Sequence, residues 1–452
     1  MNVETAGPAE ATLESALEWL RANGIERIET TVPDMAGIGR GKVQPVSQFK
    51  GVGTRIPYAI LSQTLNSSFH LGKDNVGDRD MSLRADLSTI RRIPWTPEPT
   101  AIVIMDCIDD DGNLIGAAPR AALARILSLY EQEGWKPVVA PEVEFYVVPA
   151  NEDPWSRTRQ VAEDEDDLED LIDPYGTDRF HELSGFFTEL EDTCRKQDIE
   201  TGALSQELGP GQFEVNFDHG DPMKLADDVF HFKRTIRHVA AKHDLRVIFL
   251  SKVHEDAAGS AFHIHQSVYD REGHNVFSAA DGEAHERFGH YIGGLQRYLR
   301  DFLLLFAPYP NSYRRLNSHW ASPINLEWGI DNRTVGLRVP LASAQARRVE
   351  NRLAGADVNP YLAIAGSLAC GYLGMKQEIM PTAAVEKSAY DAPFALLRHP
   401  HYSIASLRAS KEAAQVFGEE FVQLFAAMKE HECLEFEEKV PVWEREQLGW
   451  TI

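Results

Sequence analysis

The sequence has few cysteines, no long apolar segment and no excess of basic residues. Its four cysteines lie far apart and form no CxxC pair, which argues against a cysteine zinc site and a disulfide framework. No apolar run reaches the ~20 residues that span a bilayer, and the polar, acidic start is not typical of a signal peptide. Lys plus Arg number 45 against 69 Asp plus Glu, a net charge of −24 that disfavours nucleic-acid binding. We therefore expect a cytoplasmic enzyme with no membrane or nucleic-acid partner.

The chain is 452 residues long and has an ordinary globular composition, with 43% hydrophobic residues. Hydrophobic spacing predicts an amphipathic helix over 11–22, and glycine-punctuated short strands follow over 25–110. A hairpin signal at 110–113 ends this part, so we divide the chain into domains at 11–112 and 113–452. In the second part the pattern predicts a strand over 138–148, a solvated acidic loop over 163–170, and helices over 118–134, 181–198, 222–244, 284–304, 356–378 and 410–447.

Two short segments carry paired carboxylates. Glu142 and Glu144 stand two apart in the predicted strand, so both side chains point to one face. Two like charges side by side repel unless a cation lies between them, which favours a divalent metal. An exposed strand edge is the other interpretation. Glu207 and Glu214 flank a Gly-Pro-Gly turn that could aim both carboxylates into one site, although turns are often acidic without a ligand.

A His-x-His pair follows a Gly-Ser turn. His263 and His265 again share one strand face. A single histidine is more often structural than a ligand, but the pair raises the weight of a metal or substrate site. A zinc amidohydrolase would use such a pair near the start of a repeating βα barrel, and this chain lacks that repeat.

Arginines recur inside the otherwise apolar strands of the second half. In an acidic protein this placement favours bound anions, and guanidinium groups grip phosphate and carboxylate best. Glu350 and Arg352 share a strand face as the earlier pairs do. Simple surface exposure is the alternative for each arginine. Carboxylates, histidine and arginine together are the groups of metal-assisted phosphoryl transfer from a nucleotide, yet no GxxxxGK[ST] loop is present. The arginines are Arg315, Arg333, Arg338, Arg348 and Arg352.

These motifs, in this order, resemble the glutamine synthetase family along nearly the whole chain, from Pro33-Asp34-Met35 to Val442-Trp443-Glu444. Gly-Pro-Gly-Gln-Phe-Glu and Asp-Asn-Arg-Thr-Val point to its gamma-glutamylpolyamine synthetase and gamma-glutamylamide synthetase branch. The resemblance implies an α+β architecture, with an N-terminal β-grasp domain and a catalytic α/β domain whose antiparallel sheet forms a funnel. It also implies a homo-oligomer, commonly a dodecamer of two hexameric rings, with active sites shared between subunits.

The resemblance also implies roles for individual residues. Two or more Mg²⁺ or Mn²⁺ ions per site are expected, the first held by Glu144, Glu207 and Glu214 and the second by Glu142, His263 and Glu350. Nucleotide contacts are expected from His265, Ser267 and Arg348. The expected γ-phosphate clamp is Arg338 and Arg352. Arg315 and Arg333 resemble residues that hold glutamate and the transferred phosphoryl group, and Gly259 resembles a backbone contact to glutamate.

Three departures from glutamine synthetases bear on the substrate. Ala321 stands where those enzymes have a Glu, and the stretch 58–64 lacks their ammonium-binding Asp. Ala258 replaces an Asn beside the glutamate contact, which leaves the acid substrate less defined. We therefore expect an ATP-dependent ligase that joins the γ-carboxylate of L-glutamate to a polyamine or other primary amine through γ-glutamyl phosphate, releasing ADP and phosphate. The alternatives are an ordinary glutamine synthetase that uses ammonium and an inactive structural or regulatory relative.

Overall fold

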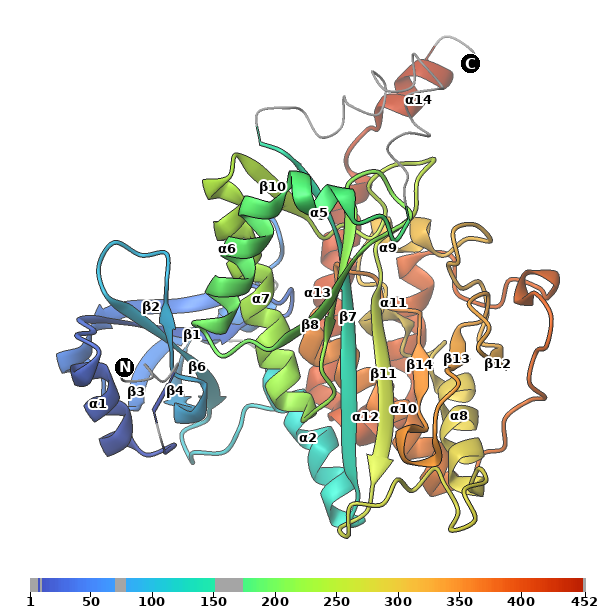
Figure 1. Cartoon of the computed structure of the whole chain (residues 1–452), viewed down its shortest axis with the longest axis horizontal. Coiled ribbons are helices and arrows are strands. Elements are labelled where there is room, and N and C mark those ends of the chain that lie inside the picture. Colours follow the sequence, from blue (N-terminus) through green and yellow to red (C-terminus); the bar gives the residue numbers. More distant parts are fainter. Residues whose placement is uncertain (1–6, 9, 70–78, 151–173, 450–452) are drawn as a thin grey trace.

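The computed structural model describes residues 7–8, 10–69, 79–150 and 174–449, and the acidic run 163–170 lies outside these ranges. The described chain forms two sheets with helices packed around them (Figure 1). No helix in the described ranges is both long and apolar enough to cross a membrane.

In the described ranges, the N-terminal part contains one α-helix and a six-stranded sheet, coloured blue in Figure 1. Helix α1 (Leu13–Ala22) matches the prediction, because Thr12 caps its start and Gly24, at a φ of 60°, follows its end. Strand β1 pairs antiparallel with β2 and parallel with β6, so β1 lies inside the sheet order β2-β1-β6-β4-β3. The strands are β1 (Arg27–Pro33), β2 (Gly39–Pro45), β3 (Val52–Pro57), β4 (Asp80–Ala85), β5 (Arg91–Ile93) and β6 (Thr100–Ile108).

The second part contains an eight-stranded sheet with the order β12-β13-β14-β11-β7-β9-β8, and β10 also pairs with β7. Its pairs are antiparallel except β12 with β13. The strand predicted over 138–148 is the central strand β7. The strands are β7 (Lys136–Pro149), β8 (Thr201–Gln206), β9 (Gln212–Phe217), β10 (Leu245–Ile248), β11 (Phe262–Tyr269), β12 (Trp328–Ile330), β13 (Leu337–Val339) and β14 (Val349–Asn351).

The predicted helices are present with small shifts at their ends, and three of them are divided or end clearly earlier than predicted. The helix expected over 181–198 is divided at Leu183, and the one expected over 284–304 ends at Tyr298. The C-terminal helix is interrupted at Gly418, whose φ of 90° is incompatible with a continuous helix. The helices are α2 (Pro119–Gln132), α5 (Asp178–Glu182), α6 (Ser184–Arg195), α7 (Pro222–Lys242), α8 (Glu286–Tyr298), α9 (Pro310–Arg315), α10 (Pro360–Gln377), α11 (Pro400–Ala409), α12 (Lys411–Phe417), α13 (Glu419–Glu437) and α14 (Val442–Gln447).

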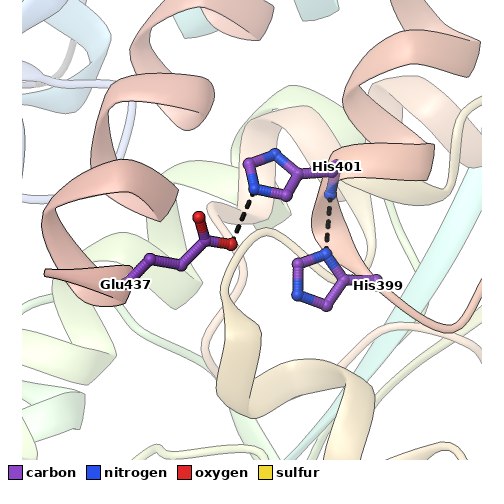
Figure 2. A group of neighbouring side chains, drawn as sticks. All are labelled: His399, His401 and Glu437. Atoms are coloured by element: carbon purple, nitrogen blue, oxygen red, sulfur yellow. Dashed lines mark hydrogen bonds and ion pairs between the residues drawn. The ribbon is translucent and has the colours of Figure 1, made fainter. Parts of the chain in front are cut away.

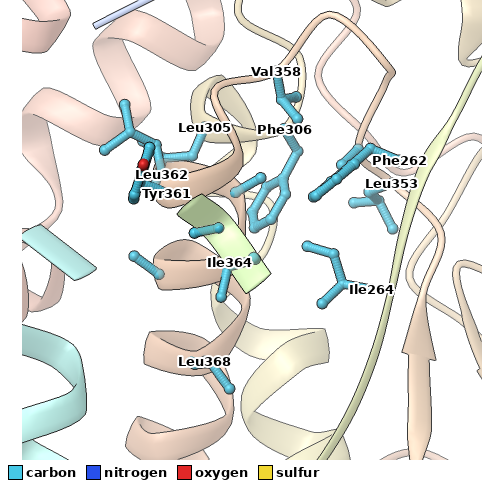
Figure 3. Packing of buried hydrophobic residues seen from close by; sticks show 14 of the residues in the cluster. Phe262, Ile264, Leu305, Phe306, Leu353, Val358, Tyr361, Leu362, Ile364 and Leu368 are labelled. Carbon is cyan, nitrogen blue, oxygen red and sulfur yellow. The ribbon is translucent and has the colours of Figure 1, made fainter. Parts of the chain in front are cut away.

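The main core lies between the second sheet and the long helix α10. Phe262 and Ile264 of β11 pack toward Phe306, Tyr361 and other apolar side chains (Figure 3). Successive side chains of a strand point to opposite faces. The residues that alternate with this apolar row therefore point away from the helices, toward the other face of the sheet.

Buried polar contacts join the N-terminal part to the second part. Arg120 of α2 donates to Asp86, Asp106 and Asp227, at 2.6, 2.7 and 3.0 Å. Tyr361 donates its hydroxyl to the same Asp227 at 2.6 Å. Buried charges need partners of this kind. The two parts are thus held together by a network that lies within one chain.

Candidate active site

The face of the second sheet opposite the helices carries a row of polar residues in register. Glu142 pairs with His263 on the adjacent strand, and Glu144 pairs with Glu214 on the other side. Glu350 of β14 lies opposite His265. Four adjacent strands, β9, β7, β11 and β14, therefore bring side chains from positions 142 to 350 of the chain into one place.

Two cavities open along this face. One of about 460 Å³ is lined by Glu142, Glu144, Glu207, Glu214, Gly259, His263, Arg315, Arg333, Arg338 and Arg352. The other, of about 850 Å³, is lined by the predicted nucleotide contacts His265, Ser267 and Arg348. Both cavities include Glu142 and Arg338, so they meet there. Glu350 is buried beside this junction. The structure therefore assembles all the predicted site residues around two adjoining cavities.

Size alone does not identify the site. A larger cavity, of about 980 Å³, lies between residues 36–38 of the N-terminal part and helix α13. Its lining is mostly apolar and includes none of the predicted site residues. The two smaller cavities, unlike this one, bring carboxylates, imidazoles and guanidinium groups together.

Within this site, two groups of side chains have metal-binding geometry. Glu142, His263 and Glu350 offer ligand atoms within 4.8 Å of one another, and so do Glu144, Glu214 and His263. The first group is the predicted second-metal set. The second group contains Glu144 and Glu214, two of the three residues predicted to bind the first metal. His263 belongs to both groups. Glu207 lines the same cavity from the turn after β8, outside the 4.8 Å group.

Several carboxyl groups lie close together in the small cavity. Burial, reinforced by the neighbouring carboxylates, raises the pKa of Glu144 to about 8, of Glu207 to about 7 and of Glu214 to about 9. Such shifts mean that the chain itself supplies too little positive charge for these groups. Oxygen donors with one imidazole suit Mg²⁺ or Mn²⁺. The donor set therefore fits the divalent cations that the resemblance implies.

The first group, which contains Glu142, His263 and Glu350, is better compensated. Burial acts to raise the pKa of Glu142, but hydrogen bonds from His263 and His265, at 3.2 and 2.9 Å, hold it well below its usual range. Burial lowers the pKa of His263 to about 4, with Arg352 adding to the effect. The imidazole is therefore neutral near pH 7, the form that ligates a metal.

Arginines also line the small cavity. Arg338 donates to Glu350 at 2.8 Å and to Asp331 at 2.7 Å, and Arg352 also donates to Glu350. Arg315 donates to the carbonyls of Arg352 and Leu353. Within the described ranges, the buried Nε atoms of Arg315, Arg338 and Arg352 have no hydrogen-bond partner. Unpaired buried donors beside an open cavity fit an anion that completes them.

Gly259 lies where no side chain fits. A Cβ at this position would stand 2.5 Å from Cγ of Arg315 and 2.5 Å from the carbonyl oxygen of Ser251. The bare backbone therefore lines the cavity beside Arg315, as a backbone contact to a substrate requires.

Sequence reasoning missed Gln212, which connects Glu144 to the backbone at Gly259 through hydrogen bonds. Its amide donates to Glu144 at 3.1 Å and to the carbonyl of Gly259 at 3.1 Å. Gln212 stands two residues before Glu214 on β9, so strand periodicity places both on the cavity face. That spacing was the available signal. Tyr175 and Trp320 also line the cavity, and nothing in the sequence pattern singles them out.

The structure shows where the three departures from glutamine synthetases lie. Ala258 and Ala321 both line the small cavity, where they leave room and add no charge. Tyr58, in the stretch without an acid, donates instead to Glu420 of α13 at 2.7 Å.

Comparisons with known proteins show which family the chain resembles. Residues 116–448 match the family described as "Glutamine synthetase, catalytic domain". The chain is 31% identical to a glutamate–isopropylamine ligase of Pseudomonas, over 94% of this chain and 95% of that one. It is 30% identical to an Escherichia coli gamma-glutamylputrescine synthetase, over 91% and 89%, and 28% identical to a Halobacterium salinarum glutamine synthetase, over 96% and 95%.

The same fold occurs in solved structures. The structure "Apo GmaS without ligand" superposes with a TM-score of 0.83 at 24% identity, covering 97% of this chain and 99% of that one. With a catalytic-domain match over most of the chain and full-length relatives, this protein belongs to the glutamine synthetase family.

Proposed function

We propose that this protein is an ATP-dependent ligase that joins the γ-carboxylate of L-glutamate to a primary amine. The observation that carries the proposal is the small cavity, which is lined by both carboxylates and arginines. Full-length relatives named for isopropylamine, putrescine and ethanolamine products support the amine as acceptor.

Two divalent cations would be held by the carboxylates that lie at this cavity. Glu142, His263 and Glu350 would bind one, and Glu144 and Glu214 would bind the other with Glu207 from the adjacent turn. Such cations, when bound, neutralise the phosphoryl oxygens of ATP and so favour transfer. Gln212 and the backbone N–H of Ala261 fix the Glu144 carboxylate, the latter at 2.7 Å, so this ligand is held in place before any metal arrives.

The nucleotide would lie in the cavity of about 850 Å³, along His265, Ser267 and Arg348. Arg348 donates to His265 Nδ1 at 3.2 Å, and His265 Nε2 contacts Glu142 at 2.9 Å, so this chain of contacts fixes the imidazole. The γ-phosphate would then reach the junction of the cavities, where Arg338 and Arg352 stabilise the charge that develops on its oxygens.

The reaction would proceed in two displacements. Arg315, Arg333 and the Gly259 backbone would hold glutamate so that its γ-carboxylate oxygen attacks the γ-phosphorus and ADP leaves. The neutral amine would then attack the γ-carbonyl carbon of the acyl phosphate, and phosphate leaves as the C–N bond forms. Exclusion of water from the cavity during the reaction would limit hydrolysis of that intermediate.

Ala321 favours a substituted amine over ammonium. A carboxylate at this position would attract a small cation, whereas a methyl group leaves space. A larger amine can recover the lost attraction by burying methylene groups, at ~0.8 kcal/mol each. Ordinary glutamine synthetase activity is the second candidate, because relatives with that name match the chain at 28–30% identity.

We also propose a β-grasp N-terminal domain over 11–112, a catalytic domain over 113–452 and a ring-shaped homo-oligomer, probed by light scattering. The parallel β1–β6 pair flanked by the antiparallel β1–β2 pair supports the β-grasp assignment. We place the protein in the cytoplasm, where ATP is available. Its four cysteines are free and buried, which suits a reducing compartment.

The test is a panel of acceptors assayed by ATP- and glutamate-dependent phosphate release. We expect kcat/KM for putrescine, isopropylamine or ethanolamine to exceed that for ammonium by about a hundredfold, as a lost charge contact of a few kcal/mol in a dry site would give. The variant Ala321→Glu should narrow this ratio, and Ala321→Val, which adds volume without charge, is the matched control. Ammonium as the best acceptor would restore ordinary glutamine synthetase, and no activity with any acceptor would favour an inactive relative.

A further inference from the structure

A third group of potential metal ligands lies away from the two active-site cavities. His399, His401 and Glu437 each offer one ligand atom, and these atoms lie within 4.8 Å of one another (Figure 2). None of the three residues lines either active-site cavity. Two imidazoles and one carboxylate form a donor set typical of zinc rather than of magnesium.

Regular secondary structure holds all three groups. His399 caps the start of α11, where its Nδ1 accepts the backbone N–H of His401 at 3.3 Å. Pro400, the first residue of that helix, restricts the backbone between the two histidines. Glu437 is the last residue of α13. Ligands on helices keep a more constant spacing than ligands on loops.

The two helices lie side by side and run in opposite directions. His401, at the start of α11, contacts Glu437 at the end of α13, with 2.7 Å between Nε2 and Oε1. Arg408, near the end of α11, pairs with Glu430 of α13 at 2.8 Å. These contacts connect both ends of α11 to α13 and keep the two histidines close to Glu437.

We propose that His399, His401 and Glu437 bind a Zn²⁺-class transition-metal ion that fastens the C-terminal end of α13 to the start of α11. Bonds of about 2.0–2.1 Å at tetrahedral angles separate neighbouring ligand atoms by about 3.4 Å. The observed spacing lies between 2.7 Å and 4.8 Å, so small side-chain rotations complete the site. His401 and Glu437 are 37% and 44% exposed, which gives the ion an entry path and leaves the fourth position to water.

The obvious competing explanation is a helix cap beside an ordinary surface ion pair. The chain supplies a matched control for it. His431 of α13 is also 37% exposed and also faces a carboxylate, Glu435, at 3.5 Å, but it stands outside the group of three. A His→Ala change there removes an imidazole–carboxylate pair from the same helix without removing a proposed ligand.

The experiment measures zinc bound per chain by equilibrium dialysis of the full-length protein in excess Mg²⁺. We expect His401→Ala and Glu437→Gln each to bind one zinc fewer per chain than wild type, or to bind it at least about tenfold more weakly. His431→Ala should match wild type. Zinc held at the active site is common to all four proteins and cancels in the comparison.

A thermal measurement gives a second, independent readout. Zinc should raise the Tm of wild type and of His431→Ala by more than it raises the Tm of Glu437→Gln, which keeps the size of the side chain and the fold. Equal zinc stoichiometry and equal Tm shifts in wild type, His401→Ala and Glu437→Gln would overturn the proposal. The active-site hypothesis does not depend on this result, since it is tested by acceptor turnover.

Discussion

Two carboxylate clusters in the described part of the chain balance their charges differently. At the junction of the two parts, Asp86, Asp106 and Asp227 all accept hydrogen bonds from Arg120. Burial acts to raise the pKa of Asp86, but the Ser88 and Arg120 donors lower it overall. Burial raises that of Asp227 although Arg120 and Tyr361 oppose the change.

In the small cavity the carboxylates Glu144, Glu207 and Glu214 instead face one another. Their pKa values are raised to between about 7 and 9, because burial and mutual repulsion act together. The difference predicts that the first cluster is structural, because it is completed within the chain, and that the second is functional, because it is completed by something that binds. Changes at the two clusters should therefore affect different properties.

The largest effect is expected at Glu144. Glu144→Gln keeps the shape but removes a charged ligand, and we expect kcat/KM to fall at least about a thousandfold, equivalent to ~4 kcal/mol of transition-state stabilisation. Circular dichroism should show an unchanged fold. Glu189→Gln, a partly exposed carboxylate on α6 that pairs with Lys242, is the control and should retain activity. Near-normal turnover in Glu144→Gln would remove this residue from the site.

The next effect concerns the structural cluster. Arg120→Met leaves buried aspartates without their partner, so we expect the free energy of unfolding to fall by about 3–5 kcal/mol. Turnover per folded molecule should be unchanged. The same substitution at the exposed Arg195, which pairs with Asp192, should cost less than about 1 kcal/mol. Denaturant titration measures both values, and similar losses in the two variants would contradict the view that burial sets the strength of this network.

The smallest effect is expected at Glu214, in the carboxylate cluster of the small cavity. The folded-state pKa of Glu214, about 9, lies above its ordinary 4.5, so in metal-free protein this group lowers stability as pH rises from 4.5 toward 9. Glu214→Gln should therefore raise the Tm of the metal-free protein at pH 8 by about 1–3 °C. It should also weaken stabilisation by Mg²⁺ or Mn²⁺. Differential scanning calorimetry with and without metal tests both, and a lower metal-free Tm would argue against repulsion at this cluster.

Strand periodicity allowed much of the site to be predicted. The two-residue spacing of Glu142 with Glu144, and of His263 with His265, placed each pair on one face before any tertiary contact was known. Alternation with buried Val143 and Ile264 confirms that assignment. The helices were predictable from their apolar spacing, but their ends were less so. Gly418 interrupts the C-terminal helix through its positive φ, a property that hydrophobic periodicity does not reveal.

The sequence by itself determined which chemical groups this protein has and the strand face on which each one lies, because these depend on residue type and local periodicity. Only the tertiary structure decided which strands became neighbours. The register of β9, β7, β11 and β14 gathers Glu214, Glu144, His263 and Glu350 from distant parts of the chain. Burial in that arrangement then sets the pKa values and creates the demand for a cation, because desolvation depends on what surrounds a group in space and not on its sequence neighbours.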